Sequence, residues 1–336
     1  MSSNVAVNET YQRVMAHTGF YHEGVPTTGV TESEEIRNNN KYLEKRIKYS
    51  AVIDTEKINA TAIYELSGSV CPERSIDFRL HGILQIGAEH IKKLPVFNAA
   101  FDSDILKVAT WGSARDIYLI QKLRTLPKIE EIAENSLKNG FKVGNQKHVI
   151  SEELLGKKWL PSGQMNRYKI DTNELETLPY TKLESPRDSQ IYKAPLIIIS
   201  EKVEPDGICA AFSESDIVYT KSYSGITISR NLIHLAYYLN GVINSSIANY
   251  FIFMTASSWG IERKKVMTQD LVQLPIPKPS EHNQIFVNQI IEIEGKLREF
   301  SPSKSVENNL KKQLDEAVFN LYGLDDNERV LVEDTT

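Results

Sequence analysis

The sequence predicts a mixed α/β protein of the α+β type. We expect a mostly antiparallel sheet flanked by helices, a small α/β segment before it and a C-terminal helical hairpin after it. Residues 128–230 alternate short apolar runs with turn signals such as Asn139-Gly140 and Pro161-Ser162-Gly163, which is typical of a sheet. Residues 232–254 change to helical spacing, and residues 286–324 repeat apolar side chains three or four positions apart.

Four segments are distinguished in the chain of 336 residues, a length sufficient for two domains. Residues 1–40 are polar and predict a flexible N-terminal arm. Residues 41–125 predict the small α/β segment, and residues 126–280 predict the sheet domain. Residues 281–336 predict the helical hairpin.

The small α/β segment is predicted from short local patterns of apolar and β-branched residues. A proline ends its last helix, because the residue before a proline disfavours the helical conformation. The expected elements are a helix over 41–48, strands over 50–53, 60–66, 75–83 and 105–110, and a helix from about Ser113 that stops before Pro127.

The sheet domain is predicted around one apolar run. Residues Pro195-Leu196-Ile197-Ile198-Ile199 predict a fully buried strand. Residues 207–212 and 217–220 are expected to be its neighbours across a turn. The polar stretch 221–230 is expected to be a loop before the helical stretch 232–254.

The C-terminal segment predicts two helices joined by a tight turn. One apolar stripe covers residues 286–300, with Ser280 as its cap and Ser301-Pro302 at its end. The second stripe covers residues 310–324, with Gly323 near its end. Such stripes require a partner surface. The sequence leaves open whether that partner is the same chain, another copy or another subunit.

The composition is typical of a globular protein, with 41% hydrophobic and 25% charged residues. The longest apolar stretch, Leu232–Thr255, contains His234, three Asn and two Ser, so we expect no membrane span. The N-terminus lacks the pattern of a secretory signal. Cys71 and Cys209 are the only cysteines, and a disulfide framework is not expected. These features favour a cytoplasmic location.

The formal net charge of −5 gives no positive support for nucleic-acid binding. The acidic excess is local, however. Residues 281–336 carry six Lys/Arg and twelve Asp/Glu, and the rest of the chain carries 33 Lys/Arg and 32 Asp/Glu. A neutral domain binds DNA only if its basic residues share one face.

The motifs of a DNA-methylating active site are absent. S-adenosylmethionine is bound by a loop with glycines two positions apart, and no two of the seventeen glycines have this spacing. Methylation of an amino group also requires a Pro-Pro-aromatic motif that holds the flipped base, and none of the thirteen prolines are adjacent.

Other catalytic and metal-binding motifs are also missing. Zinc-ligand spacings are absent, and His17, His22 and Glu23 are more simply interpreted as surface loop residues. A restriction-type nuclease would need an acidic residue and then an Asp/Glu-x-Lys pair on a strand. The segment Ser200-Glu201-Lys202 partly matches this nuclease pattern, but Ser200 occupies the position of the first carboxylate. We therefore predict no catalytic and no metal-binding residues.

Five stretches of the chain from Ile105 onward follow one another in a characteristic order. They are Leu106–Asp116, Lys193–Ile199, Tyr237–Ser246 with Tyr250-Phe251, then Trp259-Gly260, Arg263-Lys264-Lys265, Asp270-Leu271 and Leu274-Pro275-Ile276-Pro277, and finally Phe319–Leu324. In this order they resemble the C-terminal part of N6-adenine DNA methyltransferases of restriction–modification systems, including type II enzymes related to the Eco57I and TaqI groups. The resemblance covers about two thirds of the chain.

The resemblance implies a DNA target-recognition domain over residues 126–280, with the tail hairpin in a subunit interface. The family's cofactor and catalytic motifs would lie before this region and are missing, so the resemblance implies recognition without catalysis. Residues 41–100 are interpreted as a remnant of the end of a catalytic domain. S-adenosylmethionine is expected only on a partner chain or parent enzyme. The chain is then half of a split enzyme, a truncated product, or a protein with another role.

Three polar clusters are the candidate DNA contacts, since Arg, Lys, Asn, Gln and Ser read base edges and bind phosphates. Solvated loops are the alternative for the first two clusters, and an ordinary charged helix start is the alternative for the third. The candidates are Ser162, Gln164, Asn166, Arg167 and Lys169; Lys221, Tyr223, Ser224 and Arg230; and Trp259, Arg263, Lys264 and Lys265.

The leading hypothesis is a sequence-specific recognition module for double-stranded DNA in a restriction–modification or related phage-defence system. It would act with a methyltransferase or restriction subunit, and self-association through residues 281–324 stays open. One alternative is an adenine-specific methyltransferase subunit whose cofactor-binding half lies on another chain. Another is a non-catalytic oligomeric interaction protein on the same scaffold, in which the three clusters would fail to share one face.

Overall fold

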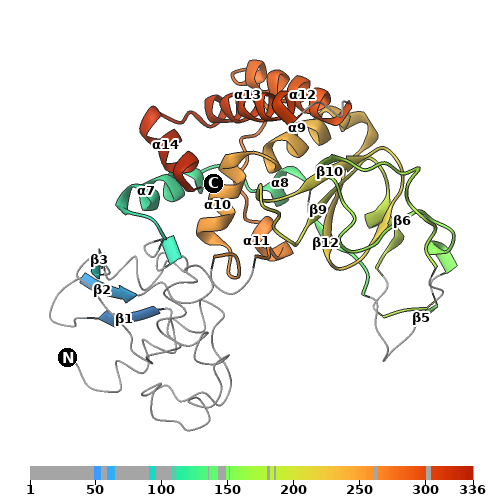
Figure 1. The fold of residues 1–336 in the computed structure, drawn as a ribbon, viewed down its shortest axis with the longest axis horizontal. Helices are drawn as coiled ribbons and strands as arrows, with labels where there is room; N and C mark the ends of the chain where they lie inside the picture. The colour runs from blue at the N-terminus through green and yellow to red at the C-terminus, as the bar shows by residue number, and fades with distance from the viewer. Residues whose placement is uncertain are drawn as a thin grey trace, which may run out of the picture. The chain divides into compact units, whose positions relative to one another are not determined.

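The computed structural model of the chain describes residues 49–53, 59–64, 91–95, 107–108, 111–134, 136–142, 149–150, 152–179, 182–184, 187–260, 264–299 and 304–335. The predicted arm 1–40, helix 41–48 and strand 75–83 lie outside these ranges. The chain divides into unit 1, Met1–Ile120 with Phe253–Lys264, and unit 2, Gln121–Ile252 with Lys265–Thr336. The described residues form a mixed α/β fold with eight α-helices and a mostly antiparallel five-stranded sheet, as predicted (Figure 1).

Unit 1 contains a three-stranded antiparallel sheet in the order β1-β2-β3. The strands are β1 (Tyr49–Ile53), β2 (Asn59–Tyr64) and β3 (Ile91–Pro95). Tyr49 lies opposite Tyr64, and Asn59 lies opposite Pro95. The first two strands agree with the predicted ones. The sequence does not predict β3, because two adjacent lysines interrupt its apolar pattern.

The segment before helix α7 (Ala114–Leu123) is helical where it is described. Lys107 and Val108 have helical backbone, and the Gly112 N–H donates to the Val108 carbonyl over 2.8 Å, which is the spacing of a helical turn. The predicted strand over 105–110 is therefore wrong at these two positions. The side chains of Lys107 and Val108 are both buried, whereas a half-buried strand would expose one of the two.

The predicted start of α7 near Ser113 is confirmed. The Asp116 carboxylate accepts the N–H of Ser113 over 2.6 Å and its hydroxyl over 2.8 Å, and the Arg115 N–H donates to the Ser113 Oγ over 3.2 Å. These bonds satisfy groups that no helical carbonyl reaches. The helix ends at Leu123, before Pro127, as the proline predicts.

The sheet of unit 2 has the strand order β4-β12-β9-β10-β7. The strands are β4 (Lys138–Asn139), β12 (Tyr223–Thr227), β9 (Leu196–Ser200), β10 (Ala210–Ser213) and β7 (Tyr168–Lys169). Neighbouring strands are antiparallel except β10 and β7. Every residue of the central strand β9 is buried, which confirms the predicted core strand.

One neighbour of β9 is predicted correctly and the other is not. β10 lies antiparallel to β9, as expected for residues 207–212. The second neighbour is β12 and not residues 217–220, because β11 (Val218–Tyr219) pairs in parallel with β6 (Trp159–Leu160). The turn at residues 220–222 separates β11 from β12, so two consecutive strands belong to different sheets.

The five-stranded sheet separates two layers of side chains. Leu196, Ile198 and Ala211 join Leu160 and Val218 in a buried core on the face of the small β pairs. Alternate residues of each strand point to the other face. There, α9 (Ile233–Ile243) packs on β9 and β10. The sheet is covered on both faces, which explains why β9 is apolar throughout.

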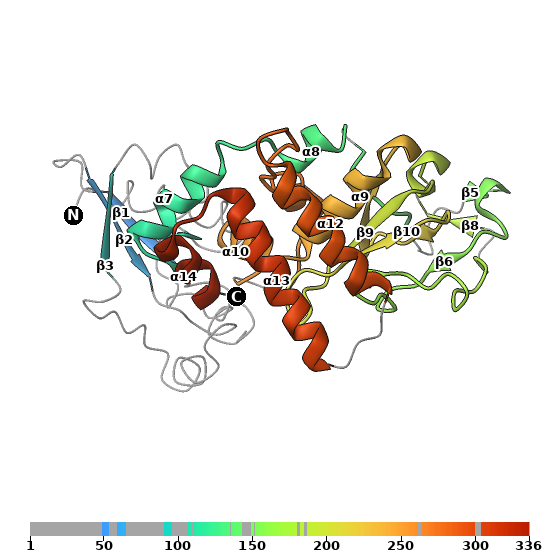
Figure 2. The same ribbon diagram turned by 90° about the horizontal axis from the view of Figure 1, so that it is seen from above.

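The helical layer continues through α10 (Ser246–Thr255), α12 (Gln284–Glu299) and α13 (Lys304–Tyr322). α12 packs on both α9 and α13 (Figure 2). Ile290 of α12 and Leu314 of α13 have 0% and 1% of their surface exposed. The apolar stripes of the predicted hairpin are therefore buried within this chain.

Several short elements complete the described fold. They are α8 (Ile129–Ile132), β5 (Val149–Ile150), η2 (Glu152–Leu154), β8 (Lys182–Leu183), η3 (Ser189–Tyr192), η4 (Arg230–Leu232), α11 (Thr268–Leu271) and α14 (Asp326–Thr335). Among all the helices described, none has both the length and the apolar character needed to cross a lipid bilayer.

Candidate nucleic-acid interface

The loop between β6 and β7, residues 161–167, is anchored at its start by Tyr223. The Tyr223 hydroxyl donates to the Pro161 carbonyl over 2.9 Å, and it accepts the N–H groups of Gly163 and Gln164 over 2.9 and 3.3 Å. Gly163 has a φ of 84°, which favours glycine. Burial raises the pKa of Tyr223, so its hydroxyl keeps the proton that it donates. The first half of the loop is thereby fixed to β12.

Arg167 anchors the other end of this loop. Its guanidinium donates to the carbonyl of Ile208, to the carbonyl of Asp206 over 3.2 Å and to Asn244 Oδ1 over 3.1 Å. Met165, in the middle of the loop, packs partly buried against the core of the sheet domain. The loop is therefore held at three points along its length.

The turn at residues 220–222 lies against the same loop. Ser162 Oγ donates to Ser222 Oγ over 2.9 Å and lies 3.1 Å from Thr220 Oγ1. The Lys221 N–H donates to the Phe141 carbonyl over 2.7 Å, which fixes the turn. The Lys221 side chain is exposed and forms no ion pair with another described residue.

Glu201, at the end of β9, connects the turn to Lys265. The Glu201 N–H donates to the Ser222 carbonyl over 3.0 Å, and its carboxylate lies 2.7 Å from the Lys265 ammonium. The Asn139 amide donates to the same carboxylate over 3.0 Å. Glu201 is only 5% exposed. A buried carboxylate with two partners is a positioning group, and here it holds Lys265 beside the turn.

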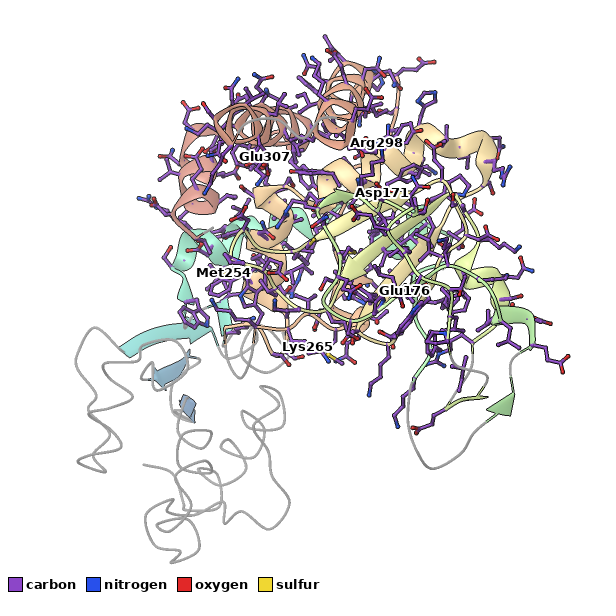
Figure 3. The ribbon with its side chains drawn as sticks, turned by 45° about the vertical axis from the view of Figure 1, so that its right-hand side comes forward. Asp171, Glu176, Met254, Lys265, Arg298 and Glu307 are labelled. Atoms are coloured by element: carbon purple, nitrogen blue, oxygen red, sulfur yellow. The ribbon has the colours of Figure 1, made fainter. Side chains whose placement is uncertain are left out.

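These contacts join three segments, distant in sequence, into one polar surface at an end of the sheet, which we call the loop face. Figure 3 shows Lys265 on the side of unit 2 away from Arg298 and Glu307, which belong to the helical layer. The exposed and half-buried polar residues that make up the loop face are Ser162, Gln164, Asn166, Lys202, Lys221, Ser222 and Lys265.

The loop face is modestly basic. Lys202 forms an ion pair with Glu204 over 3.0 Å, and Lys265 forms one with Glu201. Lys221 therefore contributes the uncompensated positive charge of this surface, as far as the described residues show. Electrostatic attraction to a phosphate backbone is correspondingly limited to a small number of contacts.

Three residues predicted to contact DNA are buried or hydrogen-bonded within the fold. Tyr223 and Ser224 are 1% and 0% exposed, because they lie in β12 and not in the expected loop before the helix. The Ser224 hydroxyl is 2.7 Å from Thr268 Oγ1. Arg167 uses its guanidinium to anchor the loop. The sequence predicts these side chains as surface contacts. In the structure they instead hold the loop face in position from inside the fold.

Lys169 and Arg230 are exposed but lie away from the loop face. Lys169 is on β7, the edge strand at the far side of the sheet from β12 and β4. Arg230 belongs to η4, beyond the end of β12, whereas Lys221 precedes the start of that strand. The first two predicted clusters therefore meet only through Ser162, Gln164 and the turn around Lys221.

The third predicted cluster is split by the division into units. Trp259 and Lys264 belong to unit 1, Lys265 belongs to unit 2, and Arg263 lies outside the described residues. The Trp259 ring packs edge-on against Phe253 with 5.5 Å between the ring centroids. Lys264 is exposed. Lys265 is the member of this cluster that the structure places on the loop face.

The nuclease-like segment does not form a metal site among the described residues. Glu201 is committed to Lys265 and Asn139, and Lys202 is paired with Glu204. No group of three His, Cys, Asp or Glu side chains suitable for a metal ion occurs in the described part of the chain. Glu201 is buried at the end of β9 and holds Lys265, whereas Lys202 beside it is exposed.

Sequence patterns did not reveal the residues that build the loop face from inside. Asn244, after α9, accepts the Ala210 N–H over 3.0 Å and donates to the Ala210 carbonyl over 3.0 Å. Asn249 accepts the Ile208 N–H over 2.7 Å. These bonds fix the segment that receives Arg167. The sequence does carry one sign of these positioning residues. Asparagines occur inside an apolar helical stretch, where each buried amide needs hydrogen-bond partners.

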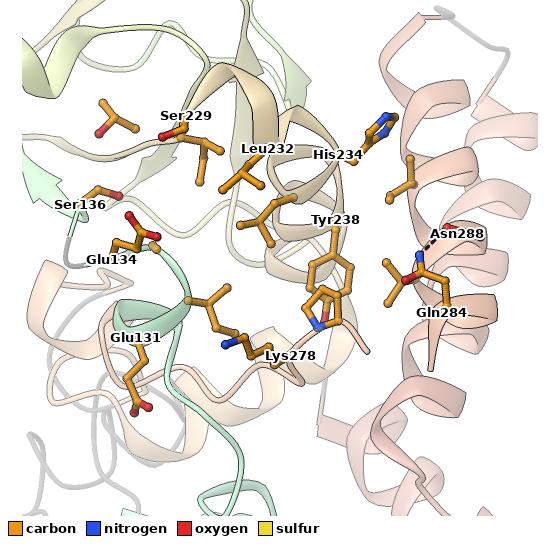
Figure 4. Close-up of a pocket in the computed structure, with 18 of the residues that line it drawn as sticks. Glu131, Glu134, Ser136, Ser229, Leu232, His234, Tyr238, Lys278, Gln284 and Asn288 are labelled. Carbon is orange, nitrogen blue, oxygen red and sulfur yellow. Dashed lines mark hydrogen bonds between the residues drawn. The ribbon is translucent and has the colours of Figure 1, made fainter. Parts of the chain in front are cut away.

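Unit 2 also contains a cavity of about 1090 Å³ beside the helical layer. Leu235, Tyr238 and Val287 contribute apolar lining. Figure 4 shows Glu131 and Glu134 on one wall and Gln284 on the opposite wall, so its charged and amide groups do not converge on one point.

Comparison with known proteins gives a partial likeness to a solved structure. No protein-family model matches the chain, and no curated protein sequence matches it. Among solved structures, the chain is similar to MmeI, described as a Type IIL restriction–modification enzyme in complex with DNA, with 15% sequence identity and a TM-score of 0.33. The match covers 41% of this chain and 20% of the MmeI chain. The matched part thus spans about a fifth of that enzyme's length.

Proposed function

We propose that this chain is a DNA-recognition module of a restriction–modification system and that it binds duplex DNA with the loop face. The observation that supports this most directly is the joining of three distant polar segments into one surface. Gln164 and Lys221 are exposed on it, and their side chains bind no other described residue. An amide and an ammonium are the groups that recognise base edges and phosphates.

The loop face offers both kinds of contact that a DNA-binding surface needs. Lys221 and Lys265 supply positive charge for phosphates, and the Ser162 and Ser222 hydroxyls add neutral donors. The hydrogen bonds of Tyr223 and Glu201 fix these groups before any ligand binds. Such preorganisation reduces the entropy lost on association.

The proposed module acts with a second chain. The family resemblance assigns recognition to this part of an adenine methyltransferase, and the motifs for S-adenosylmethionine and methyl transfer are missing from the sequence. We infer that a methyltransferase or restriction subunit supplies the cofactor site and the chemistry. Recognition and catalysis would then be divided between two polypeptides.

DNA binding is tested by fluorescence anisotropy with the full chain and labelled random duplexes over a salt series. We expect affinity to fall as salt rises. Lys221→Ala should reduce the slope of log K against log salt by about 1, because one phosphate contact is lost. Lys312→Ala is the matched control, since Lys312 is exposed on α13 and removes the same charge from another surface.

The controls separate the loop face from general attraction to DNA. Equal effects of Lys221→Ala and Lys312→Ala would show that binding does not use the loop face. Absence of binding at low salt, both for the chain alone and with the product of the neighbouring gene, would rule out the proposed function.

The catalytic alternative is tested by equilibrium dialysis with labelled S-adenosylmethionine. We expect no binding by this chain alone, and methylation of DNA only when the partner chain is added. Binding and methylation by the chain alone would make it an enzyme with an active site that lacks the usual motifs.

A further inference from the structure

Exposure alternates over residues 164–167, the second half of the loop between β6 and β7. Gln164 and Asn166 are exposed, whereas Met165 and Arg167 are partly buried. Met165 packs on the core, and Arg167 is hydrogen-bonded to the segment before β10. This alternation is that of an extended backbone, in which every second side chain points to the same side. The two amides therefore project from the same side of an anchored loop.

Neither amide is used within the fold. The side chains of Gln164 and Asn166 form no hydrogen bond with another described residue. The backbone of Gln164 is nevertheless fixed, because its N–H donates to the Tyr223 hydroxyl over 3.3 Å. A fixed backbone with an uncommitted amide is the arrangement expected of a residue that selects among hydrogen-bonding ligands.

We propose that Gln164 and Asn166 are specificity-determining residues that each recognise an adenine through the major groove of duplex DNA. The proposal rests on the proposed function and adds to it the base that is read. A primary amide presents one donor and one acceptor side by side. Adenine presents the complementary pair in the major groove, the N7 acceptor and the N6 amino donor, and this pairing is the usual one for Asn and Gln.

The geometry of the loop also limits the spacing of the two adenines. Two residues of extended chain span about 6.6 Å. Successive base pairs are about 3.4 Å apart along the duplex. The two adenines recognised by Gln164 and Asn166 are therefore expected about two base-pair steps apart, on the same strand or on opposite strands.

Tyr223 is the positioning residue for this recognition. Its hydroxyl makes three hydrogen bonds to the start of the loop, and its ring is buried in the core. Tyr223→Phe keeps the ring and removes those three bonds. The backbone of Gln164 then becomes free to move, whereas Asn166 stays close to the Arg167 anchor. The variant should weaken recognition by Gln164 more than recognition by Asn166.

The experiment is selection of bound duplexes from a random library by the full chain, with its partner if the chain alone binds weakly. We expect an enriched site with two adenines within about two base-pair steps. Gln164→Ala should lose roughly ten- to a hundredfold of the preference at one adenine, and Asn166→Ala the same at the other. The salt slope should stay that of the unchanged protein, because neither amide carries a charge that pairs with phosphate. Gln289→Ala, an exposed amide on α12, is the matched control.

A base analogue identifies the contact at the level of atoms. Replacing one selected adenine by 7-deazaadenine removes the N7 acceptor. It should weaken binding by the unchanged protein and have little effect on the variant that lacks the corresponding amide. Tyr223→Phe, with a folded circular dichroism spectrum, should reduce discrimination at the Gln164 adenine more than discrimination at the Asn166 adenine.

The outcomes distinguish this inference from the proposed function. Sequence-independent binding, or adenine preferences that survive in both Gln164→Ala and Asn166→Ala, would overturn the inference while DNA binding stands. Relaxed specificity at a guanine or a pyrimidine would overturn the assignment to adenine. Failure of every duplex to bind would overturn the inference together with the proposed function.

Discussion

Glu294 of α12 is a carboxylate with 0% of its surface exposed. Asn240 of α9 donates to its Oε1 over 2.8 Å, and the Arg298 guanidinium lies 3.5 Å away. Its second oxygen has no hydrogen-bond partner among the described residues. Burial raises its pKa to about 7, although Asn240 and Arg298 partly oppose this shift. The carboxyl group therefore changes between its protonated and ionised forms around neutral pH.

The raised pKa of Glu294 predicts how stability depends on pH. The folded protein holds this proton more tightly than the unfolded chain, whose Glu pKa is about 4.3. The contribution to stability is complete below that value, falls as pH rises, and is lost above the folded pKa of about 7. Over this interval the free energy of unfolding should decrease by roughly 3 kcal/mol from this group.

Glu294→Gln tests that dependence, because the amide keeps the shape of the protonated acid and still accepts from Asn240. The variant should be more stable than the unchanged protein at pH 8, by up to roughly 3 kcal/mol, and similar to it at pH 5. Urea denaturation at several pH values measures this. A variant with the same pH profile as the unchanged protein would show that Glu294 is not the titrating group.

At the scale of elements, the turn between α9 and α10 connects the helical layer to β10. Asn244 is 7% exposed and bonds to both backbone groups of Ala210. It also accepts from Arg167. A single asparagine therefore couples the end of a helix, the start of a strand and the anchored loop of the loop face.

Asn244→Ala should destabilise unit 2 by roughly 1–3 kcal/mol, because the buried N–H of Ala210 loses its partner. The same change should release the Arg167 end of the loop and weaken discrimination at the Asn166 adenine. Urea denaturation and the selection experiment measure the two effects. Asn231→Ala, an exposed asparagine in η4, should change neither.

At the scale of the whole molecule, the C-terminal hairpin and the sheet belong to the same compact unit. α12 packs against α9, and α9 packs against β9 and β10. The buried apolar residues therefore form consecutive layers from α13 to the small β pairs. Continuous packing of this kind favours cooperative unfolding of unit 2 as one body.

Leu314→Ala tests this cooperativity, because Leu314 is 1% exposed on α13. Trp159, in β6 on the other side of the sheet, reports whether the distant part of the unit unfolds with the hairpin. In a background with Trp111→Phe and Trp259→Phe, Trp159 is the single fluorescent tryptophan. Leu314→Ala should lower the stability reported by Trp159 by roughly 2–5 kcal/mol. Val306→Ala, at a half-exposed site on α13, should cause little change. A Trp159 transition insensitive to Leu314→Ala would show that the hairpin unfolds separately.

The sequence alone determined the elements whose pattern is local. The apolar run 195–199 predicts β9, the Ser113 region predicts the start of α7, and the stripes of residues 286–324 predict α12 and α13. The continuous apolar run reflects the burial of β9 on both faces, the helical stripes reflect one buried face, and the bonds of Ser113 to Asp116 mark the start of α7. The mixed fold class follows from these elements.

Only the tertiary structure decided which polar residues share a surface. Tyr223 and Ser224 have the composition of a loop, yet pairing with β9 buries them, because strand partners come from distant sequence. Arg167 and Glu201 resemble surface charges, yet their partners lie 77 and 64 residues away in Asn244 and Lys265. Sequence spacing cannot encode such long-range contacts, and these contacts leave Gln164, Asn166 and Lys221 as the groups available to bind a ligand.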